Sequence, residues 1–273
     1  MVNLRPWNRD SRKIFEKVLG DSTVLVLSKL IEKGKFDSVH GEVARGKESC
    51  VFIGLRESGA PVIIKIYRVE TAVFQDIMPY ITGDDRFSYF RKHRSNRALV
   101  FMWAKKEYSN LLRLKRSGLS VPLPYAVLEN VLVMEFFGDL NGAIPARTLK
   151  DEASDLSREQ LVEIRDSLIN DFLRKAYWDA GLIHADLSEY NVLIEKASSG
   201  KTVRPVVIDC AQAVLKNHPS ASEFLMRDCT NISKFFYKIL REGPSPQEVF
   251  ERVTAPSASV SSASTTTALQ DLE

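Results

Sequence analysis

The stretch that decides the fold is His184-Ala185-Asp186-Leu187-Ser188-Glu189-Tyr190-Asn191, which Asp209 follows 18 residues later at the end of an apolar run. An aspartate, an asparagine five residues on and a second aspartate behind a short β-type run are typical of phosphoryl transfer. In that arrangement Asp186 accepts the proton of the attacking hydroxyl, while Asn191 and Asp209 bind Mg²⁺ through side-chain oxygens. The alternative interpretation is that Asp186 is a turn residue and Asn191 a cap, without a chemical role.

A lysine inside an apolar strand favours the phosphoryl-transfer interpretation. Lys65 lies within the run Val62-Ile63-Ile64-Lys65-Ile66-Tyr67, where burying an unpaired ammonium group would cost several kcal/mol. From such a strand a lysine can reach the α- and β-phosphates of a nucleotide. Its expected partner is Glu107, the only acid between residues 86 and 116.

Two further segments are predicted to contact the nucleotide. Residues 41–51 join two strands and offer Lys47 and Ser49 as phosphate contacts, although such a segment taken alone is more often an ordinary turn. Glu135 and Phe136 follow a strand at the position of a hinge. Backbone groups there are expected to meet the adenine edge.

The hydrophobic pattern predicts a sheet-rich first half and a mostly helical second half. Asp21 or Ser22 is expected to cap the first helix, and Gly34 to end it. The predicted helices cover 22–33, 97–116, 155–180, 221–240 and 246–253, and the predicted strands cover 51–55, 62–67, 125–128, 131–136, 192–194 and 203–208. The predicted domains are an N-terminal helical extension (1–37), an N-lobe (38–136), a C-lobe (137–253) and a flexible Ser/Thr/Ala-rich tail (254–273).

The composition suits a soluble globular protein. The chain has 273 residues, of which 44% are hydrophobic and 27% charged, too apolar for a wholly disordered chain. Its three cysteines are widely spaced, which argues against a disulfide scaffold or a structural zinc site. No apolar run approaches the roughly 18 residues needed to span a bilayer, and no signal peptide is recognisable. We therefore expect a cytoplasmic protein without a membrane partner.

Charge is unevenly distributed, although the net charge is only +3. Residues 86–116 carry ten basic side chains against one acid, a local charge of +9 that leaves −6 for the rest of the chain. A solvated helix face would account for this, but so steep an asymmetry also favours a phosphate-rich partner surface. The ten are Arg86, Arg91, Lys92, Arg94, Arg97, Lys105, Lys106, Arg113, Lys115 and Arg116.

The order of these segments along the chain resembles that of the bilobal protein-kinase-like fold, and their residues resemble the motifs of the RIO family of atypical kinases. Arg45-Gly46-Lys47-Glu48-Ser49, residues 184–191 and Ile208-Asp209-Cys210-Ala211-Gln212 are similar to that family's phosphate, catalytic and metal loops. His218-Pro219 and residues 223–229 fit as well. The sequence His-Ala-Asp-Leu-Ser resembles the Rio-one branch.

The resemblance implies an α+β fold with a small antiparallel-sheet N-lobe and a helical C-lobe. The chain departs from ordinary protein kinases in one respect: only 64 residues and no Ala-Pro-Glu follow Asp209, so no activation segment or peptide-docking subdomains are expected. ATP with Mg²⁺ or Mn²⁺, serine autophosphorylation and slow ATP turnover are also implied, with Asp209 as a transient phosphate acceptor. The resemblance further implies a role in maturing the small ribosomal subunit, and residues 86–116 would then contact a pre-ribosomal particle or ribosomal RNA.

Two hypotheses of different classes remain. The first is an ATP-dependent serine/threonine kinase with ATPase activity, in which Lys65 holds the phosphates and Glu107 positions Lys65. The second is an ATP-gated ribosome-assembly module whose hydrolysis times release, without phosphorylation of a protein substrate. A small-molecule phosphotransferase on the same fold is a third, weaker interpretation.

Overall fold

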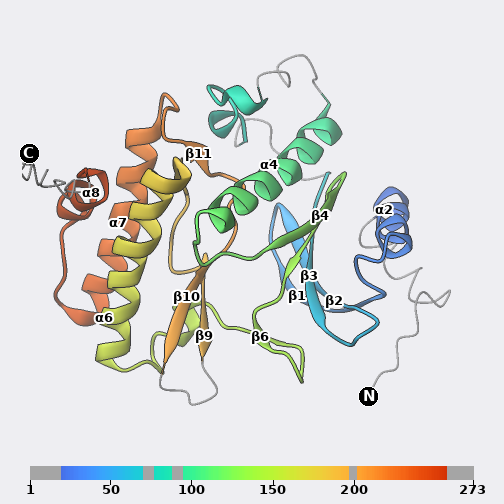
Figure 1. The fold of residues 1–273 in the computed structure, drawn as a ribbon, viewed down its shortest axis with the longest axis horizontal. Helices are drawn as coiled ribbons and strands as arrows, with labels where there is room; N and C mark the ends of the chain where they lie inside the picture. The colour runs from blue at the N-terminus through green and yellow to red at the C-terminus, as the bar shows by residue number, and fades with distance from the viewer. Residues whose placement is uncertain (1–19, 70–76, 88–94, 197–201, 257–273) are drawn as a thin grey trace, which may run out of the picture.

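The computed structural model describes residues 20–69, 77–87, 95–196 and 202–256. An antiparallel sheet with two helices forms one lobe and a group of helices forms the other (Figure 1). The domain boundaries at 38, 137 and 254 remain predictions. Most of the predicted tail, and residues 91, 92 and 94 of the basic segment, lie outside the described ranges.

The N-lobe sheet has the strand order β1-β2-β3-β5-β4, with every neighbouring pair antiparallel. Residues 41–45 are part of the first strand, so the prediction that 41–51 is one connecting loop is wrong. Gly46 donates its N–H to Ser49 O at 2.8 Å and closes a tight turn instead. The strands are β1 (Ser38–Arg45), β2 (Ser49–Leu55), β3 (Pro61–Tyr67), β4 (Pro124–Leu128) and β5 (Val131–Glu135).

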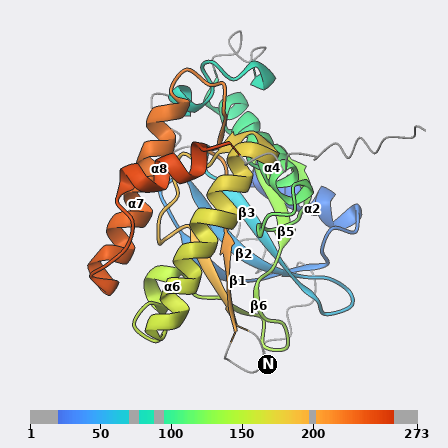
Figure 2. The same cartoon turned by 60° about the vertical axis from the view of Figure 1, so that its left-hand side comes forward.

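Helix α2 (Asp21–Glu32) covers one face of this sheet, where Leu27 and Leu30 pack among buried strand residues (Figure 2). The expected cap is wrong: neither Asp21 nor Ser22 makes a capping bond, because Gly20, with φ of 75°, occupies the N-cap position. The expected end is confirmed. Gly34 has φ of 63° and donates to Ile31 O at 2.8 Å, which satisfies a terminal carbonyl.

Helix α4 (Asn96–Arg116) belongs to both lobes. Ser95 caps it by accepting the Ala98 N–H at 3.2 Å. Its first half, including Leu99, packs with the N-lobe side of the molecule, whereas Leu111 lies in the C-lobe core. One rigid element therefore connects the sheet to the helical lobe.

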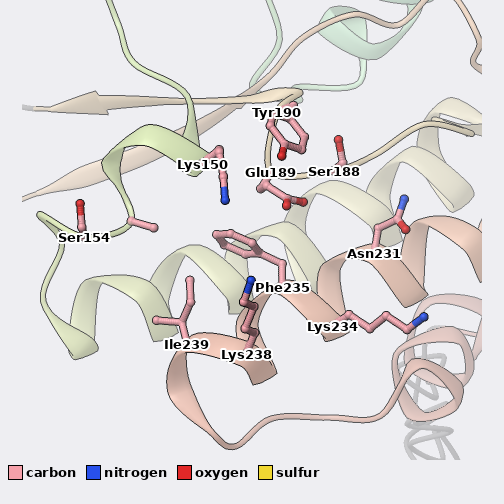
Figure 3. A pocket seen from close by; sticks show the side chains of 11 residues that line it. Lys150, Ser154, Ser188, Glu189, Tyr190, Asn231, Lys234, Phe235, Lys238 and Ile239 are labelled. Atoms are coloured by element: carbon pink, nitrogen blue, oxygen red, sulfur yellow. The ribbon is translucent and has the colours of Figure 1, made fainter.

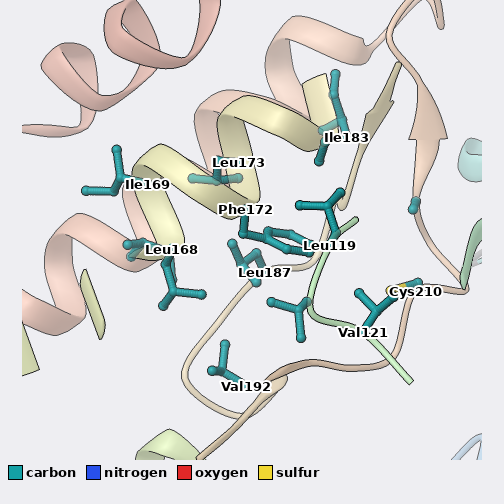
Figure 4. Close-up of a cluster of buried hydrophobic side chains, with 14 of the residues drawn as sticks. Leu119, Val121, Leu168, Ile169, Phe172, Leu173, Ile183, Leu187, Val192 and Cys210 are labelled. Atoms are coloured by element: carbon teal, nitrogen blue, oxygen red, sulfur yellow. The ribbon is translucent and has the colours of Figure 1, made fainter. Parts of the chain in front are cut away.

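The predicted helices and strands of the second half are present in the helical lobe, but part of one predicted helix is π-helical. The predicted helix over 155–180 is split: α6 (Arg158–Asp166) begins at the Ser157 capping box, and the π-helical segments η3 (Ser167–Leu173) and η4 (Ala176–Ala180) follow. Apolar side chains of η3, such as Phe172, share one buried cluster with Leu187 and Val192 (Figure 4). The other elements of this lobe are β6 (Gly138–Asp139), β7 (Ile144–Pro145), α5 (Leu149–Glu152), β8 (Leu182–Ile183), β9 (Val192–Lys196), β10 (Val203–Val207), β11 (Val214–Leu215), α7 (Ala221–Leu240) and α8 (Pro246–Thr254).

Residues 210–220 alone connect Asp209 to α7, and only the two-residue strand β11 interrupts them. An activation segment does not fit in this connection. The predicted bilobal fold without that segment is confirmed.

Candidate functional site

The site is centred on Lys65 of β3, a buried side chain that bonds to a residue of the other lobe. Its Nζ donates to Glu107 Oε1 at 3.0 Å and to Asp209 Oδ1 at 2.8 Å. The structure thus contains the expected Lys65–Glu107 pair, and Tyr67 donates its hydroxyl to the second Glu107 oxygen. Although burial favours the neutral amine, the carboxylates of Asp209 and Glu107 hold the pKa of Lys65 above its usual value. Lys65 therefore stays a cation.

The two carboxylates beside Lys65 differ in exposure and in pKa. The Glu107 side chain is completely buried, and that burial raises its pKa despite the nearby ammonium group. The Asp209 side chain is 45% exposed. The partial burial of Asp209 would by itself raise its pKa, but the neighbouring Lys65 ammonium group lowers the pKa of Asp209 overall. Asp209 is consequently the carboxylate that can face a ligand as an anion.

The predicted catalytic loop lies beside Asp209. Asn191 donates through Nδ2 to Asp186 O at 2.9 Å and to Asp186 Oδ2 at 3.2 Å. Partial burial, together with the negative charge of Asp209, raises the pKa of Asp186. A carboxylate with a raised pKa is a better proton acceptor near neutral pH. Asp186 is therefore suited to receive a hydroxyl proton.

Two residues of the site have left-handed backbones. Ala185 has φ of 66° and Asp209 has φ of 58°, a region that L-residues other than Asn and Asp rarely occupy. At Ala185 this conformation is strained, and such strain persists only where surrounding contacts impose it. Ala185 directly precedes Asp186, so other contacts must hold this loop in place.

One such contact is made by Asp228, which the sequence did not single out as a site residue. Its carboxylate accepts the N–H groups of Ala185 and Leu187, each at 2.8 Å, and thereby fixes the backbone on both sides of Asp186. Burial raises the pKa of Asp228 to about 7, against the pull of these two bonds. The signal in the sequence was an acid on the apolar stripe of residues 221–240.

A second set of supporting contacts comes from Lys106 and Asn110 of α4, which we call the clamp. Sequence reasoning missed these two residues as well. Lys106 is fully buried and donates to Ala211 O at 2.9 Å and to Ala213 O. Asn110 donates to Cys210 O at 2.8 Å and to Ala213 O at 3.0 Å. Residues 210–213 directly follow Asp209, so this clamp fixes the position of that carboxylate.

The remaining predicted nucleotide contacts come from the turn between β1 and β2 and from the end of β5. Lys47 is exposed at the β1–β2 turn, and Ser49 opens β2. Glu135 uses its carboxylate for Lys115 Nζ at 3.0 Å and its N–H for Leu123 O at 2.9 Å. These two groups of Glu135 are therefore not available to adenine. Phe136 follows directly and is 6% exposed.

Several charges of the basic segment 86–116 are structural. Lys106 belongs to the clamp, Arg86 pairs with Asp84 at 2.7 Å, and Arg113 donates to Ala180 O. Lys115 is held by Glu135. Among the described residues of this segment, at least four basic side chains thus make contacts within the chain and are not simply part of a free basic surface.

The oxygen donors of the site fit a hard divalent cation. Asn191 uses its amide nitrogen for Asp186, which leaves the amide oxygen as its ligand atom, and Asp209 supplies a carboxylate. Within the described ranges, no group of three or more His, Cys, Asp and Glu side chains could hold a metal by itself. Mg²⁺ typically takes one or two protein oxygens and completes its shell with phosphates and water. The donor set therefore fits a nucleotide-bound metal.

Comparisons with known proteins agree with this geometry. The model of the RIO domain family matches residues 50–249. The RIO-type serine/threonine-protein kinase Rio1 of Haloferax volcanii is 37% identical over 235 residues, which cover 85% of this chain and 75% of that protein. Human serine/threonine-protein kinase RIO1 is 34% identical over 250 residues, which cover 92% of this chain and 42% of the human protein. The chain thus spans less than half of the human relative.

A crystal structure of the Rio2 kinase–ADP/Mg²⁺–phosphoaspartate complex from Chaetomium thermophilum superposes with a TM-score of 0.65 at 26% sequence identity. The match covers 85% of this chain and 66% of that one. No helix within the described ranges has the length and apolar character needed to cross a membrane. The predicted resemblance to the RIO family and its Rio-one branch is confirmed. The chain therefore belongs to the RIO family and is a serine/threonine-protein kinase of the RIO type.

Proposed function

We propose that the chain transfers the γ-phosphoryl group of ATP to a serine or threonine hydroxyl, including one of its own. Asp186 accepts or orients the hydroxyl proton, and Lys65, positioned by Glu107, binds the phosphates. Lys47, Ser49 and Phe136 complete the nucleotide contacts. The observation that carries this proposal is the buried Lys65 ammonium held between Glu107 at 3.0 Å and Asp209 at 2.8 Å.

Asn191 and Asp209 would hold Mg²⁺ or Mn²⁺ in this function. The metal supplies positive charge that neutralises the phosphate oxygens as the bond to the leaving group breaks. Their oxygen donors support this assignment, as does the ADP/Mg²⁺ in the Rio2 neighbour.

Asp209 is also proposed as a transient phosphoryl acceptor. The Rio2 neighbour is a phosphoaspartate complex, and Asp209 is the partly exposed carboxylate of this site. An acyl phosphate is cleaved by hydroxylamine, whereas a phosphoserine ester is not. Label from γ-³²P-ATP that hydroxylamine removes, and that Asp209→Asn no longer acquires, would support this step.

The test of the main proposal is the Asp186→Asn variant, which keeps the shape of the side chain. We expect it to bind ATP and to lose autophosphorylation, measured by labelling with γ-³²P-ATP. Asp179→Asn, at an exposed position of η4, is the matched control and should label like the natural chain. Unchanged labelling of Asp186→Asn would overturn the assignment.

The biological setting proposed for this activity is maturation of the small ribosomal subunit, in the cytoplasm. It is supported by the family resemblance and by exposed basic residues of α4, such as Lys105 and Arg116. Co-sedimentation with small ribosomal subunits tests it, with and without ATP. If ATP hydrolysis releases the chain while Asp186→Asn fails to release, the ATP-gated assembly module becomes the better description.

A further inference from the structure

A groove of about 620 Å³ lies beside the catalytic loop, on the C-lobe face. It is separate from the Lys65 centre and is formed by α5, the loop 188–190 and the second half of α7 (Figure 3). We call it the acceptor-side groove. Its lining residues are Lys150, Ala153, Ser154, Ser188, Glu189, Tyr190, Asn231, Lys234, Phe235, Lys238 and Ile239.

Both walls of the groove are hydrogen-bonded to the loop that carries Asp186. On one side, the Lys150 N–H donates to Glu189 O at 3.0 Å. On the other side, Asn231 donates through Nδ2 to Leu187 O at 3.0 Å. A ligand in the groove would therefore contact elements that touch the residues directly after the proposed proton acceptor.

The groove combines positive charge with an apolar floor. Lys150, Lys234 and Lys238 are exposed, and among the described residues none of the three has an ion-pair partner. In Figure 3, Lys150 and Lys238 approach the Phe235 ring from opposite sides. Glu189 is the only acid in the lining.

Apolar surface at the groove is also accessible. Ile239 is 38% exposed and Tyr190 is 58% exposed, which is high for large apolar side chains. A ligand with both negative charge and apolar side chains would match the lysines and this surface together.

We propose that the acceptor-side groove binds an acidic segment of the protein substrate, with carboxylates or phosphates on the lysines and an apolar side chain over Phe235. This inference rests on the proposed function, because it names the substrate class of the same site. A nucleic-acid backbone would satisfy the lysines, but not the apolar floor. The hydrogen bonds of Lys150 and Asn231 connect this groove to the loop that carries the proposed proton acceptor.

The test is a binding measurement that needs no catalysis. The probe is a short fluorescein-labelled peptide with one serine, followed by several glutamates and a leucine; its partner peptide carries glutamines instead. We expect the acidic peptide to bind more tightly by fluorescence anisotropy, with an affinity that falls as sodium chloride is added. The triple variant Lys150→Gln/Lys234→Gln/Lys238→Gln should lose about tenfold in affinity, since each exposed pair contributes modestly.

Matched variants keep the result specific. The triple lysine-to-arginine variant retains the charge and should bind the acidic peptide nearly as well as the natural chain. Lys33→Gln, at an exposed position of the other lobe, should not change the affinity. Thermal unfolding of each variant shows that the fold is intact.

Three outcomes would overturn the proposal: equal binding of both peptides, tighter binding of a single-stranded RNA oligonucleotide at the same lysines, or acidic-peptide affinity that rises when residues 257–273 are deleted. The last result would make the chain's own C-terminal segment the occupant. Failure of the proposed function looks different, because the natural chain would then label no hydroxyl while acidic-peptide binding persists.

Discussion

At the residue scale, the site depends on how buried charges are compensated. Lys65 is acceptable inside an apolar sheet because two carboxylates lie within 3.0 Å of its ammonium group. The reverse also holds, because Glu107 is fully buried and relies on Lys65 and Tyr67. Removing one partner leaves the other charge unpaired in the interior, which is far more costly than removing both.

This asymmetry gives a prediction for Lys65. The Lys65→Met variant should lose phosphoryl transfer and also lose about 3–5 kcal/mol of unfolding free energy, because Glu107 is left without its cation. The double variant Lys65→Met/Glu107→Gln should regain most of that stability and none of the activity. Urea unfolding and γ-³²P-ATP labelling measure the two effects. Lys29→Met, on the exposed surface of α2, is the control, and a double variant as unstable as the single would contradict the expectation.

His184 gives a pH prediction. Its Nε2 lies 3.1 Å from Ile208 O, and its Nδ1 is buried without a partner among the described residues. Burial lowers the pKa of His184 to about 4, so the folded chain binds fewer protons than the unfolded chain between pH 4 and 6.5. Stability should therefore fall as the pH falls through that window, by at most roughly 3 kcal/mol from this residue. Urea unfolding of His184→Gln should show a shallower fall across the same window, and equal slopes would refute the assignment.

At the scale of elements, α4 acts as the anchor of the loop after Asp209. Lys106 and Asn110 stand one turn apart on that helix, and both bond to carbonyls between residues 210 and 213. Asp209 itself has a left-handed backbone, with φ of 58°, and directly precedes these carbonyls. The helix therefore positions the proposed metal-binding side chain through the residues that follow it.

Lys106→Met tests this positioning role. The variant removes the donor to Ala211 O, so the Asp209 loop should become less well fixed. We expect the apparent affinity for Mg²⁺ in nucleotide binding to fall about tenfold, since a lost hydrogen bond of this kind costs on the order of 1–3 kcal/mol. The neighbouring Lys105 is exposed, so the control variant Lys105→Met should leave the Mg²⁺ dependence unchanged. A purely structural role would lower the unfolding temperature without moving the Mg²⁺ dependence.

Residues 77–87 dock on the helical lobe through a similar local fit. The ring of His218 contacts Thr82 O at 2.8 Å, and Gly83 has φ of 98° beside Pro219. A Cβ atom at position 83 would lie 2.6 Å from Pro219 Cδ. The contact therefore requires glycine for space as well as for backbone conformation.

Gly83→Ala should destabilise the chain by roughly 1–3 kcal/mol through overpacking, in addition to backbone strain. Gly59→Ala is the matched control, because Gly59 has φ of 81° but a Cβ atom added there would meet no atom within 4 Å. The loss of stability in this control therefore measures the cost of the left-handed backbone alone. Urea unfolding measures both variants, and equal losses would show that contact with Pro219 is unimportant.

At the scale of the whole molecule, the largest apolar cluster joins the two lobes, because Leu132 and Met134 of the sheet lie in it together with residues of α4, α6 and α7. Lys65 comes from the sheet, whereas Asp186, Asn191 and Asp209 come from the helical lobe. The proposed nucleotide site is thus completed only when both lobes are folded and in place.

A ligand that binds only this assembled site should stabilise both lobes together. We expect a non-hydrolysable ATP analogue with Mg²⁺ to raise the Tm, and EDTA to remove most of that rise and all labelling. Asp209→Asn should show little Mg²⁺-dependent rise. Scanning calorimetry measures the shift, and an analogue-induced rise that EDTA leaves intact would contradict metal binding at Asn191 and Asp209.

The sequence alone predicted the main helices and strands, the bilobal fold and the candidate residues of the Lys65 centre, but it missed the strand β1. Those features depend on local periodicity and on residues such as Asp186 and Asn191 whose spacing is fixed along the chain. It also predicted the Lys65–Glu107 pair, because a lysine in an apolar strand needs a buried acid. The N-cap of α2 was mispredicted because a glycine backbone, rather than a side chain, begins that helix.

Only the tertiary structure decided how the site is supported. Asp228 is 43 residues from Ala185, and Lys106 is 105 residues from Ala211, so no local pattern indicates those contacts. The structure also showed that much of the described basic segment makes internal contacts and that three lysines line a groove beside the catalytic loop. The physical reason is that side-chain periodicity reports which face is buried, whereas the partner of a buried polar group depends on which distant segments fold against it.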